Sequence, residues 1–245
     1  MPNWVKTQIA ARGDKEQVQK LIETVKRTYT DENGEECTTE FSFQSIIPMP
    51  DSLSIEDGSM GELGMRYLLA LAKSEFSRTK TDNDDIVKMG EMKWNDPDRY
   101  NQCVDLGRQY LKNIADHGCK TWYDWCSINW GTKWDACEVE GDGCGNYIFE
   151  TAWAFCEPVI EKLSQMFPEL EIEFAYADED CGCNTGIGTF KGGELVESEF
   201  PDSCTDRAYE IYCQCWNCED LVKCEDGEWR WLDEIEDTDE DTDED

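Results

Sequence analysis

The stretch NYIFETAWAFCEPVIEKLSQMFPELEIEFAYA, residues 146–177, places one helix pattern between two strand patterns. Side chains at both ends alternate with period two, which is typical of a strand with one buried face. On those faces lie Tyr147, Phe149, Thr151 and Trp153 in the first strand, and Leu170, Ile172, Phe174 and Tyr176 in the second. Between them, Pro158 favours the first turn of a helix and Pro168 ends it. The stretch therefore predicts a strand, a helix and a strand.

The N-terminal 50 residues show the same order of patterns. Val5, Thr7 and Ile9 have the spacing of a half-buried strand. Asp14 is a typical N-cap for the amphipathic helix that follows. The segment EFSFQSIIPMP, residues 40–50, is rich in aromatic and branched residues and ends in two prolines, so we expect a second strand there.

Two such units predict an α+β fold in which helices cover one face of a mostly antiparallel sheet. We expect a ferredoxin-like split βαβ sandwich over residues 1–200, with a helical insertion at about 51–118, where only helical spacing occurs. Glycines at 192–193 and 227 predict two further hairpins. A Cys-rich extension follows over 201–232.

The segment WYDWCSINWGTKWDAC, residues 122–137, holds four tryptophans. Both faces of its alternating pattern are largely apolar, so we expect a core strand that is covered on both sides. Gly131 interrupts the alternation, and a bulge there would turn the next side chains toward a site. We therefore predict a binding edge formed by Gly131, Thr132, Lys133, Trp134 and Asp135.

The charge of the chain is strongly negative and unevenly distributed. The formal net charge is −34 at pH 7, and residues 134–232 hold 24 acidic residues against 5 basic ones. Such a field favours partners with a basic surface and opposes binding to phosphate groups. We expect a protein partner with a basic surface, and neither direct nucleic-acid binding nor membrane binding.

The two ends of the chain suggest where it acts. Residues 233–245, DEIEDTDEDTDED, hold ten acidic residues and one apolar residue, which predicts a disordered acidic tail. The first residues lack the apolar core of a secretory signal, and no run reaches the roughly 18 apolar residues of a membrane span. We expect a cytoplasmic protein.

Fourteen cysteines in a reducing compartment favour metal binding or simple burial over disulfides. The runs CGC at 181–183 and CQCWNCEDLVKC at 213–224 offer thiolates at spacings that a tetrahedral zinc site can use. The candidate zinc ligands are Cys181, Cys183, Cys213, Cys215, Cys218 and Cys224. The spacing matches neither of the common ferredoxin runs, so we expect no iron–sulfur cluster.

Signs of catalysis are weak in this sequence. It contains no phosphate-binding glycine loop, dinucleotide fingerprint or nucleophile elbow. The single histidine, His117, precedes Gly118, where a helix end favours a cation. Asp124 and Asp135 flank the tryptophans and are the two carboxylates that an enzymatic hypothesis would test. We expect a protein that is not an enzyme.

The segments MPNWV, FSFQSIIPMP, TWYDWCSINWGTKWDA, FETAWAF, LSQMFPELEIEFAYADED and GTFKGGELV occur in this order over residues 1 to about 200. Together they resemble the YubB-type ferredoxin-like proteins of bacteriophages and conjugative plasmids. The resemblance implies a ferredoxin-like fold, a bacterial cytoplasm and a mobile-element origin, and it carries no catalytic residues. The cysteine content and the region from Cys204 onward depart from that family's pattern.

Three functions are compatible with these observations. The first is a non-catalytic accessory protein of a phage or plasmid that binds a host or element protein. The second is an acidic nucleic-acid mimic that inhibits a host defence enzyme. The third is a zinc-stabilised regulatory module.

Overall fold

The computed structural model describes residues 2–31, 33–233 and 235. The chain divides into two units, one formed by Met1–Pro48 with Asn129–Asp245 and the other by Met49–Ile128. The predicted helical insertion at about 51–118 falls within the second unit. The predicted tail, 233–245, lies outside the described residues except for two positions.

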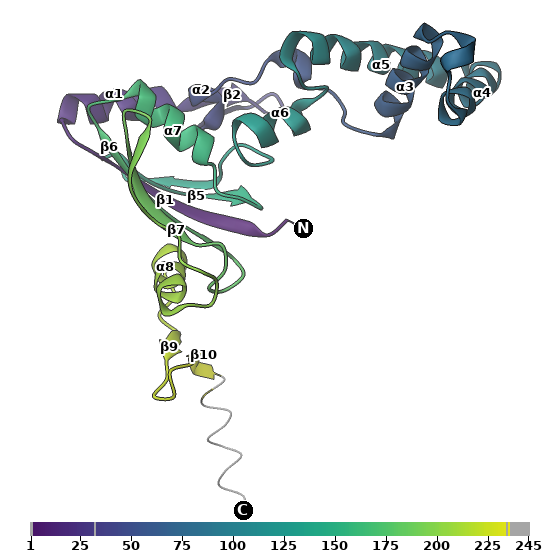
Figure 1. Cartoon of the computed structure of the whole chain (residues 1–245). Helices are drawn as coiled ribbons and strands as arrows, with labels where there is room; N and C mark the ends of the chain where they lie inside the picture. The colour runs from purple at the N-terminus through teal and green to yellow at the C-terminus, as the bar shows by residue number, and fades with distance from the viewer. Residues whose placement is uncertain (1, 32, 234, 236–245) are drawn as a thin grey trace, which may run out of the picture. The chain divides into compact units, whose positions relative to one another are not determined.

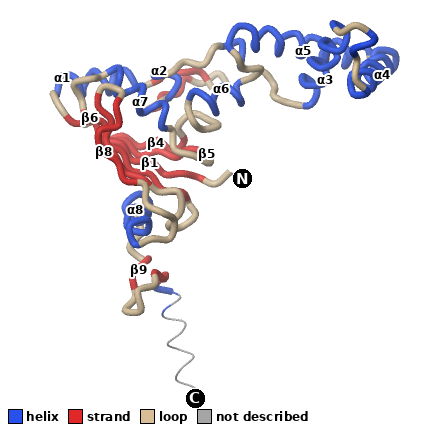
Figure 2. Tube along the Cα trace, in the orientation of Figure 1, coloured by secondary structure: helices blue, strands red, loops and turns tan. Residues whose placement is uncertain are grey.

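The first unit is built on a six-stranded sheet in which all neighbouring strands are antiparallel. In spatial order the strands are β4 (Cys137–Gly141), β5 (Asn146–Ala152), β1 (Trp4–Arg12), β6 (Glu171–Asp178), β7 (Gly186–Lys191) and β8 (Glu194–Glu199). Figure 2 shows the strands in red. The sheet confirms the expected α+β class.

Helices α1 (Lys15–Val25) and α7 (Glu157–Met166) lie on the same face of this sheet, as Figure 1 shows. The Asp14 side chain accepts hydrogen bonds from the first-turn amides of α1, as its sequence position predicts. Leu21 of α1 and Leu163 of α7 are fully buried, and so is Val5 of β1. The main core therefore lies between these helices and the sheet.

The strand register explains why the alternating patterns were informative. Ile9 pairs with Phe174, and both side chains are buried on the helix-covered face. Phe149 of β5 is fully buried on that face too. The prediction was wrong for Trp153, because β5 ends one residue earlier and Trp153 has a φ of +67° and is 47% exposed.

The expected strand at 40–50 is wrong, because this segment forms the short helix α2 (Phe43–Ile46) and irregular backbone. Phe41 and Phe43 are buried and pack against Phe149, with ring centroids 5.0 and 5.7 Å away. Phe41 and Phe43 therefore contribute to the core from the layer that covers the sheet, and not from a strand of the sheet. The position next to β5 is taken instead by β4.

The expected core strand in the tryptophan segment is also wrong. Residues Trp122–Asn129 form helix α6. The buried Trp125 lies four positions after the buried Thr121, which is a helical spacing, and it is followed by the buried Cys126, whereas Ile128 is 67% exposed. An alternating run of this length cannot by itself separate a strand from a short buried helix.

The second unit is helical. Its main elements are α3 (Ser59–Ala72), α4 (Lys80–Asn95), α5 (Pro97–His117) and most of α6, with short 3-10 turns at Asp51–Leu53 and Glu75–Ser77. Helices α3 and α5 cross at Gly64 and Gly107, where a Cβ on either glycine would overlap the backbone of the other helix. Glycine is required here because the two backbones are in direct contact.

The C-terminal elements of the first unit lie on the other face of the sheet. Helix α8 (Asp206–Trp216) packs Ile211, Tyr212 and Cys215 against Ala175 and Ala177 of β6. The hairpin of β9 (Leu221–Lys223) and β10 (Trp229–Trp231) follows, with its turn at the predicted Gly227. Near the N-terminus, a separate hairpin pairs β2 (Arg27–Thr30) with β3 (Glu36–Thr39). Because α8 reaches only one end of the strands, part of this face is uncovered.

Candidate functional site

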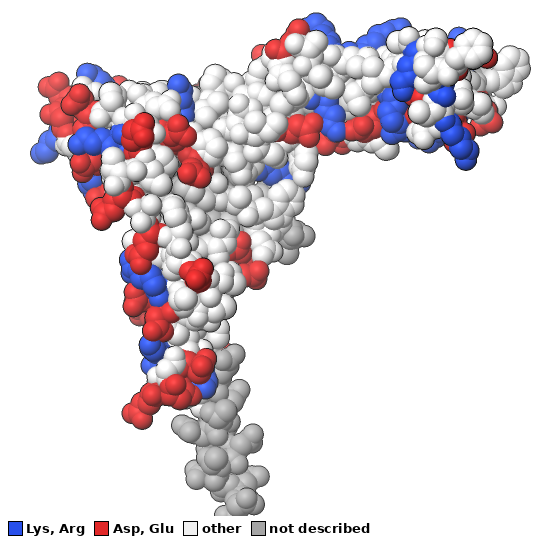
Figure 3. All heavy atoms as spheres, viewed as in Figure 1, with Lys and Arg blue, Asp and Glu red and all other residues white. Residues whose placement is uncertain are grey.

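The open face is the face of the six-stranded sheet opposite α1 and α7. The register places seven acidic and three basic side chains on it: Glu140, Glu150, Glu171, Glu173, Glu194, Glu197, Glu199, Lys6, Arg12 and Lys191. Each of the three bases forms an ion pair with a glutamate of this face. Figure 3 shows acidic side chains, with some basic ones among them, along the left and lower parts of the first unit. The open face therefore has a net negative charge.

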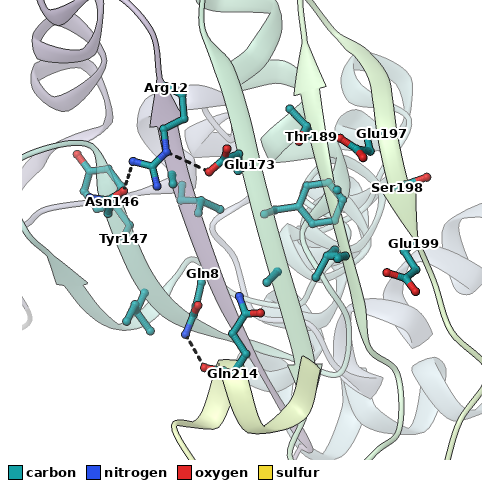
Figure 4. Close-up of a pocket in the computed structure, with 17 residues that line it drawn as sticks. Gln8, Arg12, Asn146, Tyr147, Glu173, Thr189, Glu197, Ser198, Glu199 and Gln214 are labelled. Carbon is teal, nitrogen blue, oxygen red and sulfur yellow. Dashed lines mark hydrogen bonds and ion pairs between the residues drawn. The ribbon is translucent and has the colours of Figure 1, made fainter. Parts of the chain in front are cut away.

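An open hollow of about 790 Å³ lies on this face. Figure 4 shows its lining, which comes from β1, β5, β6, β7, β8 and the end of α8. The labelled residues are Gln8, Arg12, Asn146, Tyr147, Glu173, Thr189, Glu197, Ser198, Glu199 and Gln214. No histidine or cysteine is among the described residues that line it. Its chemistry is that of an amide, hydroxyl and carboxylate surface.

Hydrogen bonds among the lining residues hold the elements around the hollow together. The Arg12 guanidinium donates to Glu173 Oε2 and to Asn146 Oδ1, each at 3.0 Å, and thereby links β1 to both neighbouring strands. Gln8 Nε2 donates to the backbone carbonyl of Gln214 at 3.0 Å and so ties β1 to α8. Within the described residues, Glu197 forms no ion pair, whereas Glu199 pairs with Arg207 at 2.9 Å. The carboxylate of Glu197 is thus available to a partner.

The predicted binding edge at Gly131–Asp135 begins with two residues that are packed internally. Gly131 has a φ of +76°, and a Cβ there would lie 2.9 Å from Cδ of Pro158. Thr132 is buried, and its hydroxyl donates to the carbonyl of Ala152 at 2.8 Å. These two residues fix the chain against β5 and α7.

The middle of this edge is an aromatic cluster. The Lys133 ammonium lies over the rings of Trp134 and Trp153, 4.2 and 4.9 Å from their centroids. Trp4 lies 6.0 Å from Trp134, centroid to centroid. Lys133 therefore already occupies one face of each of these two rings, where an external cation could otherwise bind.

The two aspartates of the enzymatic hypothesis lie in different units. Asp135 accepts hydrogen bonds from the Ser42 hydroxyl and the Phe43 amide, both at 2.6 Å, and so anchors α2. Asp124 lies on α6, where it pairs with Lys120 at 3.9 Å. His117 is in the last turn of α5, as expected, and its Nε2 is 3.0 Å from the Ser52 hydroxyl. The hydrogen bonds to Ser42 and Phe43 give Asp135 a structural role.

The six candidate zinc ligands occupy three different environments. Burial, together with the nearby Cys213 and Cys218 thiols, raises the pKa of Cys181 to about 11. Cys215 faces the core instead, where burial raises its pKa to about 12. Cys224 lies on the β9–β10 hairpin, where its amide donates to the carbonyl of Glu228. The candidate ligands are therefore closely spaced in the sequence, but they do not all lie together in the structure.

Cys204 is a thiol that the spacing did not indicate. It adjoins Cys183, because its amide donates to the carbonyl of Gly182 at 2.9 Å and the neighbouring thiol contributes to the raised pKa of Cys183 after burial. In the described part of the chain, no group of three or more Cys, His, Asp or Glu is arranged to hold a metal ion. Zinc binding stays a prediction, and Cys181, Cys213 and Cys218, with Cys183 or Cys204, are the thiols that would carry it.

The described helices include none that is long and apolar enough to cross a membrane.

The order β4-β5-β1-β6 with α1 and α7 on one face defines a ferredoxin-like arrangement that β7 and β8 extend. Residues 129–217 match the model of the ferredoxin-like domain in Api92-like proteins. A solved structure, protein api92 from Yersinia pseudotuberculosis, is 11% identical to the chain, with a TM-score of 0.35 over 83% of this chain and 99% of that one. No curated protein matches the chain.

Proposed function

We propose that this protein is a non-catalytic accessory protein that binds a partner protein with a basic surface through the open face of its sheet. The observation that carries this proposal is the hollow on the face opposite α1 and α7, with its excess of carboxylates. A sheet of this kind commonly covers one face with helices and leaves the other to solvent. The uncovered face is then free to bind.

The electrostatics favour a basic partner. Seven carboxylates against three basic side chains on the open face would attract a basic surface and speed its encounter with the protein. The polar groups at the floor of the hollow, such as Arg12 and Gln8, are engaged with their neighbours. Such a surface suits recognition better than proton transfer or nucleophilic attack.

We place this activity in the cytoplasm of a bacterium that carries a phage or plasmid. The support is the resemblance of six sequence segments to YubB-type proteins. In that setting the basic partner would be a host protein or a protein of the same mobile element. Inhibition of a nucleic-acid-binding enzyme by charge mimicry is one form that such binding would take.

The proposal is tested by measuring the affinity of a captured partner for matched variants. The full chain is immobilised, partners are captured from bacterial lysate at low salt, and the identified partner is then purified for titration. Thr189→Lys adds a cation to the lining of the hollow, between Glu173 and Glu197, whereas Thr24→Lys makes the same change on α1, on the other face of the sheet. Both sites are threonines with half-buried side chains, so the two substitutions are matched in size, charge and exposure.

We expect Thr189→Lys to weaken binding by about tenfold or more, because the new lysine would repel the basic side chains of the partner. Thr24→Lys should bind as the unmodified protein does, and salt should weaken both complexes. If the two variants bind equally well, or if the affinity is independent of salt, the open face is not the binding surface.

A further inference from the structure

Strand β8 forms one outer edge of the six-stranded sheet. All six of its residues, Glu194–Glu199, are exposed. The described part of the chain places no strand beyond it, so the side of β8 away from β7 presents backbone donors and acceptors to solvent. An extended peptide can add to such an edge through main-chain hydrogen bonds.

The opposite edge of the sheet is less suited to strand addition. Strand β4 pairs irregularly with β5 between Cys137 and Glu140, and Glu138 has a φ of +48°. A bulge of this kind bends an edge and interrupts its regular spacing. In β8 the pairing with β7 is regular where Glu197 faces Thr189 and Glu199 faces Ile187. The register shift of this strand pair lies between Leu195 and Glu197, nearer to the β7–β8 turn.

The two sides of β8 differ in chemistry. On the open face, Glu197 and Glu199 project beside the hollow. On the side of the helices, Leu195 pairs with the buried Phe190, and Phe200 lies against Gly186 just past the strand. Leu195 and Phe200 are 38% and 52% exposed. A strand laid along β8 would therefore meet carboxylates on one side and apolar side chains on the other.

Pairing of β8 with a second copy of itself is opposed by charge. The glutamates of the two copies would lie close together across the new strand pair, and like charges at that distance are destabilising. A strand that presents lysine or arginine toward Glu197 would gain from the same geometry. The edge therefore discriminates against self-association and in favour of a basic strand.

We infer that β8 accepts an extended segment of the partner as a seventh strand, and that this segment alternates basic with apolar side chains. The alternation follows from the period of two in any strand. The inference rests on the proposed function for the basic character of the partner, and it adds the mode of binding. The basic side chains would cover the end of the hollow at Glu197, and the apolar ones would cover Leu195 and Phe200.

Two synthetic peptides with the length of β8, six residues, test this inference on the full chain. In one, lysine and valine alternate; in the other, the same residues are grouped with the lysines at one end. Affinity is measured by titration, and hydrogen exchange of the β8 amides is measured with and without peptide. Glu197→Lys is compared with Glu23→Lys, the same substitution on α1 behind the sheet.

We expect the alternating peptide to bind at least about tenfold more tightly than the grouped one and to slow exchange at β8. Glu197→Lys should lose most of this affinity, whereas Glu23→Lys should not. Equal, salt-dependent binding of both peptides without slower exchange would overturn strand addition and leave the proposed function standing. Absence of binding by either peptide would also overturn strand addition, while the titration of Thr189→Lys with the captured partner decides the function separately.

Discussion

Replacing Asp135 with alanine tests whether this carboxylate holds the fold. It accepts the Ser42 hydroxyl and the Phe43 amide at 2.6 Å and the Ala136 amide at 2.9 Å. Hydrogen bonds to a charged group contribute about 1.5–3 kcal/mol each, and a buried donor left without a partner costs about 1–3 kcal/mol. Ser42 is fully buried. Because the contributions of neighbouring bonds do not add, we expect a loss of about 2–4 kcal/mol in the free energy of unfolding.

The assay is urea unfolding followed by tryptophan fluorescence, and Asp124→Ala is the matched control. Asp124 is 38% exposed and its contact with Lys120 is 3.9 Å long, so its loss should cost less than about 1 kcal/mol. Partner binding by Asp135→Ala should be unchanged under conditions where the variant is folded. The reasoning is refuted if both variants unfold at the same urea concentration while Asp135→Ala alone has lost partner binding.

Three further predictions concern packing and ionisation. Gly64→Ala should destabilise the second unit by about 1–3 kcal/mol because its Cβ would overlap α5, whereas Gly90→Ala, whose Cβ meets nothing, should stabilise it by about 0.5–1 kcal/mol; thermal unfolding of both variants compares them. Burial raises the pKa of the Cys156 thiol, so alkylation followed by mass spectrometry should modify the exposed Cys144 well before Cys156; equal rates would contradict its burial. Burial raises the pKa of Tyr147 from 10.0 to about 12, so stability should be fully present below pH 10 and fall as the pH rises toward 12, and Tyr147→Phe should weaken that dependence in urea unfolding followed across this range.

The strands that flank the main core could be predicted because one face of each is buried. Val5 and Ile9 in β1, and Ile172 and Phe174 in β6, alternate with exposed or half-exposed residues. That pattern depends only on the period of a strand and on the presence of one core. It can therefore be recognised in the sequence without knowing which strands lie next to one another in the sheet.

The segments at 40–50 and 122–130 could not be assigned in the same way. Their aromatic and branched residues fit a strand, but contacts distant in sequence decide their structure. Asp135 supplies the hydrogen bonds that hold Phe43 at the start of α2. Trp130, just past α6, donates its indole N–H to the carbonyl of Ile47 at 2.9 Å. Local pattern is a weak guide where tertiary hydrogen bonds determine the backbone.

The candidate site was missed for a related reason. Gln8, Asn146 and Thr189 lie far apart in the sequence and are brought together only by the strand order. Their signal in the sequence is weak, since it consists of polar residues on the second face of strands whose first face is apolar. The cysteine spacing misled for the opposite reason. Cys213 and Cys215 are two positions apart in the sequence, but residues two apart on a helix do not share a face, and Cys215 is buried in the core.

Carboxylate footprinting of the complex with the captured partner tests the binding surface most directly. Glutamates are labelled with a water-soluble carbodiimide and an amine, with and without partner, and the modified sites are quantified by mass spectrometry. The open face predicts that Glu173 and Glu197 lose labelling in the complex, while Glu16 and Glu23 on α1 are labelled as before. Protection of Glu16 and Glu23 with unchanged labelling of Glu173 and Glu197 would contradict binding at the open face.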